Sequence, residues 1–206
     1  LEPEAALAHL SQAAEGGGGM AAKANALLGR LNTARLYDEP AYTSLSVGRW
    51  LGSQGEWQLA LLAFQQAVAQ RPDYAEAWAY LGEALQQTQA APAGLVELQT
   101  ALELDPASIA ASLLTSLYWQ RQGEFEKARE TLESAAAHEP ENPYLQAELG
   151  RVSAGLGDLP AAQAYYEQAV ALAPTEPLFW RLLAQFSLDR QIQVRQLALP
   201  AARAAL

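Results

Sequence analysis

The sequence predicts an all-α solenoid of antiparallel helix pairs, and three observations indicate this class. Four prolines recur every 34 residues, and small and large residues recur with the same step. Each unit holds two stretches of helical periodicity separated by a turn. One helical hairpin cannot bury its apolar face alone, so neighbouring hairpins are expected to stack. The recurring positions are Pro72, Pro106, Pro140 and Pro174; Ala60, Gly94, Ala128 and Ala162; Phe64, Leu98, Leu132 and Tyr166; Ala67, Ala101, Ala135 and Ala169; and Gly48, Gly82, Ser116, Gly150 and Ala184.

The first helix of each unit has one apolar face. In residues 75–85, Trp78, Leu81, Gly82 and Leu85 follow the i, i+3, i+4, i+7 spacing of such a face. Two antiparallel helices approach closely where both carry almost no side chain, so Gly82 and Gly94 are expected to mark a close contact. This predicts that Gly94 lies on the second helix of its unit.

A turn and a second helix complete each unit. Gly55, Gly123 and Gly157 stand where the first helix ends and a residue tolerant of positive φ is needed. The second repeat has Gln89 at that position and uses the stretch QAAPAG instead, with Pro92 in the first turn of the next helix. In the second helices the small and large recurring residues are expected to face inward, and the recurring proline stops the helix.

The identities and spacing of these positions resemble the tetratricopeptide repeat. The resemblance implies a right-handed superhelix whose first helices line a concave groove, and it leaves the partner open because one scaffold serves many partners. The expected organisation is a partial repeat and a glycine-rich break in residues 1–19, an irregular helix in 20–40, full repeats in 41–74, 75–108, 109–142 and 143–176, and a fifth repeat with an insertion and a truncated second helix in 177–206.

The irregular ends give three further expectations. Ala6, Leu10 and Ala13 have second-helix spacing, so the chain opens half-way through a repeat, and the glycines before Met20 break the helix. The fifth unit carries an insertion after which the small inward residue is Ala202. The chain begins and ends within helical patterns, which indicates a piece of a longer protein.

The charge balance argues against two classes of partner. The 23 acidic residues outweigh 13 basic ones, giving a net charge of −10, whereas nucleic acids and anionic membranes bind clustered basic faces. The longest uncharged run, residues 106–120, is shorter than the roughly 18 apolar residues that span a membrane. We therefore expect neither nucleic acid nor direct membrane insertion in this stretch.

Catalytic and metal-binding patterns are also missing from the sequence. There is no cysteine, and the only histidines are His9 and His138, on different repeats. The run before Lys23 lacks the glycine and the hydroxyl residue of a phosphate loop, so a break or an engineered linker is the better interpretation. Glu76 and Glu83 lie two helical turns apart, too far to chelate alone. We expect no enzyme activity, no metal and no cofactor.

Tryptophan is a common binding residue, but packing explains it here. Trp78 and Trp180 occupy equivalent first-helix positions and are expected in the core. Trp119 lies on the matching helix between them, and an exposed anchor for a partner stays an alternative for this residue.

The first helices should present a partner-binding groove on the face opposite the packing residues. The surface predicted from the resemblance is mixed, with an apolar strip, tyrosines at two levels and charges of both signs. Its main residues are Tyr42, Leu45, Arg49, Glu76, Ala79, Glu83, Leu113, Leu117, Arg121, Tyr144, Arg151 and Arg181. The best-known subclass of the family holds a peptide carboxylate with a lysine and asparagine cluster. The matching positions here hold Leu45, Arg49, Tyr80, Ala110 and Leu114, so that cluster is absent.

These observations predict a non-enzymatic scaffold that binds a protein or peptide in its groove. One alternative is a structural spacer or oligomerisation module, which would self-associate through terminal helices that expose Leu178, Leu182 and Phe186. Another is the recruiting or regulatory arm of a larger enzyme or membrane protein.

Overall fold

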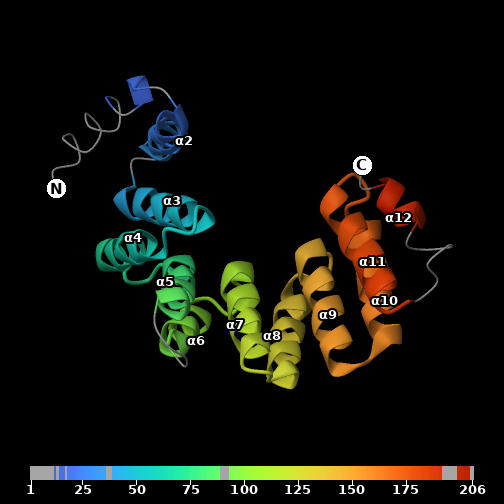
Figure 1. The fold of residues 1–206 in the computed structure, drawn as a ribbon. Coiled ribbons are helices and arrows are strands. Elements are labelled where there is room, and N and C mark those ends of the chain that lie inside the picture. The colour runs from blue at the N-terminus through green and yellow to red at the C-terminus, as the bar shows by residue number, and fades with distance from the viewer. Residues whose placement is uncertain are drawn as a thin grey trace. The chain divides into compact units, whose positions relative to one another are not determined.

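The described part of the chain is all helical. The computed structural model describes residues 12, 14–16, 18–35, 39–88, 93–191 and 199–204, and no strand occurs among them (Figure 1). The helices are α2 (Gly18–Arg35), α3 (Pro40–Ser53), α4 (Trp57–Gln70), α5 (Ala75–Thr88), α6 (Leu95–Leu104), α7 (Ile109–Arg121), α8 (Phe125–His138), α9 (Pro143–Leu156), α10 (Leu159–Leu172), α11 (Pro177–Asp189) and α12 (Leu199–Ala204).

The chain divides into two compact units, unit 1 (Leu1–Leu104) and unit 2 (Asp105–Leu206). In unit 1, helices α2 to α6 each pack against the next along the chain, and in unit 2 helices α7 to α12 do the same. The first helices of successive hairpins also touch, α3 on α5 and α9 on both α7 and α11. Each unit is thus a stack of helix pairs, the solenoid that the repeat predicts.

The recurring small residue of each first helix meets the recurring large residue of its own hairpin. A Cβ atom added to Gly82 would lie 2.8 Å from Cγ of Leu98, and one added to Gly150 would lie 3.1 Å from the Tyr166 ring. In both pairs the two residues are sixteen apart in the sequence. The 34-residue step therefore brings the same helix–helix contact to both of these hairpins.

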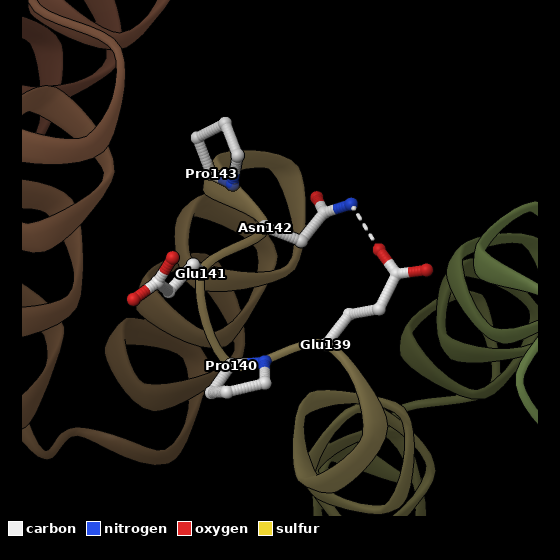
Figure 2. Close-up of a pocket in the computed structure, with 5 residues that line it drawn as sticks. All are labelled: Glu139, Pro140, Glu141, Asn142 and Pro143. Carbon is white, nitrogen blue, oxygen red and sulfur yellow. Dashed lines mark hydrogen bonds between the residues drawn. The ribbon is translucent and has the colours of Figure 1, made fainter.

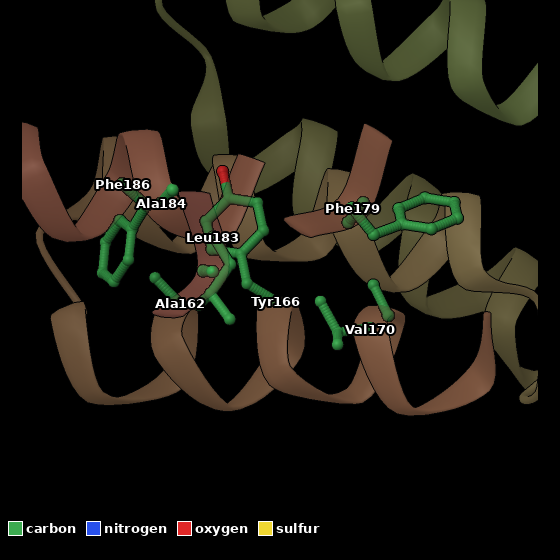
Figure 3. Packing of buried hydrophobic residues seen from close by; sticks show 10 residues of the cluster. Ala162, Tyr166, Val170, Phe179, Leu183, Ala184 and Phe186 are labelled. Atoms are coloured by element: carbon green, nitrogen blue, oxygen red, sulfur yellow. The ribbon is translucent and has the colours of Figure 1, made fainter. Parts of the chain in front are cut away.

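The inward stripe of the second helices is confirmed. Ala60, Ala128 and Ala162 are fully buried. Tyr166 of α10 also lies against Phe186 of α11, the first helix of the next hairpin, with ring centroids 5.2 Å apart (Figure 3). Phe186, which the sequence predicts to be exposed, is therefore buried. The buried stripe of each second helix therefore packs against the first helices beside it, and the core lies between them.

The turns follow the predicted chemistry. Gly55, Gly123 and Gly157 adopt φ values of 79°, 78° and 82°, in the left-handed region where a side chain is disfavoured. Side chains also cap the starts of first helices, as in α7 and α9. Ser108 accepts from the amide of residue 111 at 3.3 Å, and Asn142 accepts from the amide of residue 144 at 3.0 Å.

The second repeat differs from the expectation in one element. The helix α6 begins at Leu95, whereas α4, α8 and α10 begin at equivalent positions four residues earlier in their repeats. Gly94 lies in the turn before α6 with φ of 92°, which is incompatible with a place on the second helix. The close contact itself is present, because a Cβ on Gly82 would lie 2.8 Å from the Gly94 carbonyl oxygen. Residues 89–92, including Gln89 and Pro92, are outside the described residues.

The ends also differ in detail. The helix α2 includes Gly18 and Gly19 of the glycine run, which the sequence predicts to be a break. In α12 the buried small residue is Ala201, 1% exposed, whereas Ala202 is exposed. The buried small residue therefore lies one position before Ala202, the residue at which the sequence pattern is expected to resume. Residues 1–11, 13 and 192–198 are outside the described residues, and with them the expected opening half-repeat and most of the insertion.

Candidate partner-binding surface

Three neighbouring first helices of unit 2 carry six of the twelve predicted groove residues. Leu113, Leu117 and Arg121 follow at i, i+4 and i+8 along α7, so they lie on one helix face. Tyr144 and Arg151 are two turns apart on α9, which contacts α7 on one side and α11 on the other. We call the surface formed by these five residues and Arg181 of α11 the first-helix face of unit 2.

The apolar part of this face consists of a leucine packed against the core and an exposed tyrosine ring. Leu113 is half-buried and packs against the cluster around Leu149 and Val152. Tyr144 is 50% exposed, and its ring meets Phe179 edge-on at a centroid distance of 5.2 Å. Because Phe179 is 1% exposed, the core holds one side of the tyrosine while the other side remains in solvent.

The charged part centres on an ion pair within α9. Arg151 donates from Nε and Nη2 to Oε2 of Glu148 at 2.9 and 2.6 Å. The pKa of Tyr166 on α10 is raised to about 12 by burial and, to a smaller extent, by the Glu148 carboxylate. Arg151 and Arg190 oppose that rise. Arg190 also donates from Nη2 to the Ala154 carbonyl at 3.2 Å.

On the corresponding face of unit 1, two charged groups form an ion pair between neighbouring first helices. Arg49 of α3 donates to Oε1 of Glu76 on α5 at 3.1 Å and lies 5.0 Å from the centre of the Tyr80 ring. Tyr80 in turn stacks on Phe64 at 5.5 Å, and burial raises its pKa. Tyr42 is half-buried. These contacts link two successive hairpins, so part of the polar surface has a structural role.

Three predicted groove residues are not accessible. Leu45, Ala79 and Glu83 are 1%, 0% and 5% exposed. Leu45 belongs to the core cluster with Phe64 and Leu81. The expectation that these three residues line an open groove is therefore wrong, because all three side chains are buried. Glu83 also accepts from Nε2 of the Gln87 side chain at 2.8 Å.

Trp78 and Trp180 each form a hydrogen bond to the turn that precedes their helix. The indole nitrogen of Trp78 donates to the carbonyl of Pro72 at 2.7 Å, and that of Trp180 donates to Pro174 at 2.8 Å. Gln146 stands at the equivalent position of the repeat between them and donates to Pro140 at 2.9 Å. In each case the donor follows the helix-stopping proline by six residues. The side chain thus joins the start of one hairpin to the end of the preceding one.

Trp119 also has packing partners. Its ring meets Tyr118 edge-on at 5.0 Å and lies under the Lys127 ammonium group at 4.6 Å. It is half-buried against the cluster that contains Leu132. These contacts match the packing interpretation better than that of an exposed anchor.

The described residues contain no cluster of three or more His, Cys, Asp or Glu side chains that could hold a metal ion.

A pocket of about 370 Å³ lies at the turn between α8 and α9 and is lined by the five residues from Glu139 to Pro143 (Figure 2). Within it Asn142 donates to Oε2 of Glu139 at 3.1 Å. All five lining residues come from one turn, so no second helix contributes side chains that could contact a ligand there.

Across the described ranges, no helix has the length and apolar character needed to span a membrane.

Comparison with protein families identifies the repeat. A model described as "Tetratricopeptide repeat" matches residues 120–186, and one described as "TPR repeat" matches residues 48–89, which together make just over half of the chain. The chain belongs to the tetratricopeptide repeat family. Scaffolds of this family are generally non-catalytic, and membership supports a role in protein–protein interaction.

Relatives of this tetratricopeptide repeat chain match part of it. The "Peroxisomal targeting signal receptor" of Komagataella phaffii is 35% identical over 85 residues, which are 41% of this chain and 15% of that protein. The "PEX5-related protein" of Homo sapiens is 28% identical over 92 residues, 45% of this chain and 15% of that protein. The chain thus spans about 15% of the length of these curated relatives.

Solved tetratricopeptide repeat structures share the fold. A thermophilic TPR protein of Thermus thermophilus has a TM-score of 0.69 at 24% identity, covering 81% of this chain and 90% of its own. The pilF protein of Pseudomonas aeruginosa has a TM-score of 0.68 at 20% identity, covering 82% and 78%. MamA of Desulfovibrio magneticus has a TM-score of 0.56 at 18% identity, covering 81% and 91%.

Sequence reasoning left two residues out of the surface. Glu148 was not included, although its spacing of three from Arg151 is a pattern that predicts an ion pair on a helix. Tyr80 lies at the border between the packing face and the predicted groove, so the sequence assigns it to neither. Its contacts with Arg49 and Phe64 come from two other helices, so no local pattern could have indicated them.

Proposed function

We propose that this chain is a non-enzymatic scaffold that binds a peptide or a partner protein in a groove lined by the first helices of unit 2. The observation that carries the proposal is the Tyr144 side chain, which is 50% exposed and braced by the buried Phe179 ring. An aromatic residue held in this way loses little conformational freedom on binding, which is a common property of interface hot spots.

The neighbouring residues suit the rim and floor of such a site. Leu113 and Leu117 keep part of their apolar surface accessible, and Arg121, Arg151 and Arg181 are exposed around them. An apolar centre with a polar rim is the usual composition of a protein-binding surface. Arginine is well suited to the rim because its guanidinium can hold a carboxylate through two parallel hydrogen bonds.

Unit 1 supports the proposal less strongly. Leu45 and Ala79 are 1% and 0% exposed, and Arg49 is paired with Glu76. A ligand there would first have to compete with contacts that hold α3 against α5. We therefore assign the proposed site to unit 2.

The relatives support a protein ligand in general terms. By their names, those from Komagataella phaffii and Pichia angusta are receptors for a targeting signal. The positions matching the lysine and asparagine cluster of the best-known subclass include Leu45 and Ala110 in this chain, which cannot hold a carboxylate. The proposed mode is therefore contact with apolar side chains and arginines.

The proposal is tested by locating a bound peptide. Peptides selected from a random displayed library against the whole chain are added to protein with labelled leucine methyl groups. We expect the methyl resonances of Leu113 and Leu117 to shift, because they line the proposed groove.

Leu59 and Leu62 provide the matched control. They are 52% and 61% exposed on the second helix α4, so their methyl groups are accessible to any peptide that binds apolar surface without selectivity. Shifts confined to Leu59 and Leu62, or the absence of any peptide that shifts Leu113 or Leu117, would contradict the proposal.

A further inference from the structure

Three arginines of unit 2 form a diagonal series across its first helices. Arg121, Arg151 and Arg181 are each 30 residues apart, while the repeat itself is 34 residues long. Each arginine therefore stands four residues earlier in its helix than the one before. All three are exposed.

The four-residue shift keeps the arginines on one face. Four residues are about one helical turn, so the side chains point in nearly the same direction and step along the helices by about 6 Å per repeat. Because α9 contacts both α7 and α11, neighbouring axes are separated by about 9 Å, a typical packing distance. Successive arginines are then roughly 11 Å apart. We call this series the arginine ladder.

The ladder contrasts with the charge of the rest of the protein. The chain carries a net charge of −10, yet α7, α9 and α11 carry these three arginines against two carboxylates, Glu148 and Asp189. Asp189 accepts from Nε2 of the Gln185 side chain at 2.6 Å. Basic groups therefore gather on the face that the proposed function assigns to a partner.

The Glu148 ion pair leaves room for a ligand. Arg151 uses Nε and Nη2 toward Glu148, and its Nη1 group makes none of the hydrogen bonds just described. The side chains of the pair are 43% and 28% exposed, and an ion pair at such exposure contributes about 1 kcal/mol or less. A second carboxylate can therefore share or replace this partner.

We propose that the arginine ladder recognises an acidic peptide segment in an extended conformation. This inference rests on the proposed function and names the chemistry of its partner. A polyproline II segment rises about 3.1 Å per residue and returns to the same face every third residue, a step of about 9 Å. Long arginine side chains can bridge the remaining difference, so Asp or Glu at every third position would meet successive arginines.

The test compares peptide selections on two forms of the whole chain. A random displayed library is selected against the wild type and against the double variant Arg151→Glu, Arg181→Glu. Wild-type selection should enrich Asp and Glu at intervals of three residues. The variant should bind those peptides at least about tenfold more weakly, since one charge-assisted hydrogen bond accounts for about that factor. Added salt should weaken wild-type binding as well.

The double variant Lys127→Glu, Arg203→Glu is the control for net charge. It changes the charge by the same amount on the second helices α8 and α12, and its affinity for the same peptides should stay within about twofold of the wild type. Selected peptides without acidic enrichment, or equal affinity of the wild type and the Arg151→Glu, Arg181→Glu variant, would overturn the ladder. If such peptides still shift the Leu113 and Leu117 methyl groups, the proposed function stands while this inference fails.

Discussion

Gly82 of α5 lies against Leu98 of α6 with no room for a side chain, since an added Cβ would come 2.8 Å from both Leu98 Cγ and the Gly94 carbonyl oxygen. The Gly82→Ala variant should therefore lower the free energy of unfolding by about 1–3 kcal/mol, the usual cost of overpacking. Chemical denaturation of the two proteins measures the difference.

Gly29 supplies the control for this prediction. It lies within α2, and nothing stands within 4 Å of a Cβ added there. Gly29→Ala should be neutral or gain up to about 1 kcal/mol from higher helix propensity. If both Gly→Ala variants changed the free energy of unfolding equally, the close contact at Gly82 would not explain the requirement for glycine there.

The repeat period predicted a close approach of Gly82 to Gly94, and both residues belong to one hairpin. The positive φ of Gly55, Gly123 and Gly157 could be predicted for the same reason, since a helix end is a local feature. The later start of α6 at Leu95 was not predicted, because the 34-residue step alone places Gly94 on the second helix, whereas its φ is 92°.

The candidate surface was less predictable than the fold. Helical periodicity indicates which side of a helix a residue faces, and it placed Tyr144 and Arg151 where they are exposed. It does not indicate how far the next hairpin covers that side. Leu45 is buried in a cluster that includes Ala77 and Leu81 of the next hairpin, a tertiary contact that no pattern within one helix indicates.

Thr115 offers a test of the polar core of unit 2. It is 3% exposed on α7, and its hydroxyl oxygen has no hydrogen-bond partner among the described residues. Thr115→Val keeps the shape and removes the unpaired group, so we expect a gain of about 1 kcal/mol in the free energy of unfolding. Thermal or chemical denaturation checks the sign.

Thr131 is the matched control in the same unit, because its hydroxyl donates to the Lys127 carbonyl at 2.8 Å. Thr131→Val removes a hydrogen bond that is made, so it should be neutral or slightly destabilising. A loss of stability in Thr115→Val would show that the hydroxyl at position 115 contributes to folding.

Tyr166 predicts a loss of stability at alkaline pH. Its pKa is about 12 in the folded protein against an ordinary value of 10.0. Between these values the unfolded chain releases the phenol proton while the folded chain retains it, so unfolding becomes more favourable as the pH rises. The full contribution below pH 10 is roughly 2–3 kcal/mol, and it is lost as the pH rises through the folded-state pKa.

Tyr166→Phe isolates this effect. The variant keeps the ring that packs on Gly150 and removes the proton. Its free energy of unfolding should fall less than that of the wild type between about pH 8 and about pH 11. Tyr74 of unit 1, whose pKa is also raised to about 12, should retain its own share of the pH dependence in both proteins. Identical pH profiles would contradict the assignment to Tyr166.

The central claim is that the first-helix face of unit 2 binds a protein partner. The double variant Leu113→Asp, Leu117→Asp places two charges on the apolar strip of that face. Leu59→Asp, Leu62→Asp makes the same chemical change on the outer helix α4, where both leucines are exposed. Tyr144→Ser probes the face without changing its charge, and it remains informative if the aspartate variant does not fold.

The most direct measurement is the affinity of these variants for one peptide selected on the wild-type chain, with circular dichroism to confirm helical content. We predict that Leu113→Asp, Leu117→Asp abolishes binding, that Tyr144→Ser weakens it about tenfold or more, as expected for a hot-spot aromatic, and that Leu59→Asp, Leu62→Asp leaves it unchanged. Unchanged binding by folded Leu113→Asp, Leu117→Asp and Tyr144→Ser proteins would contradict the account.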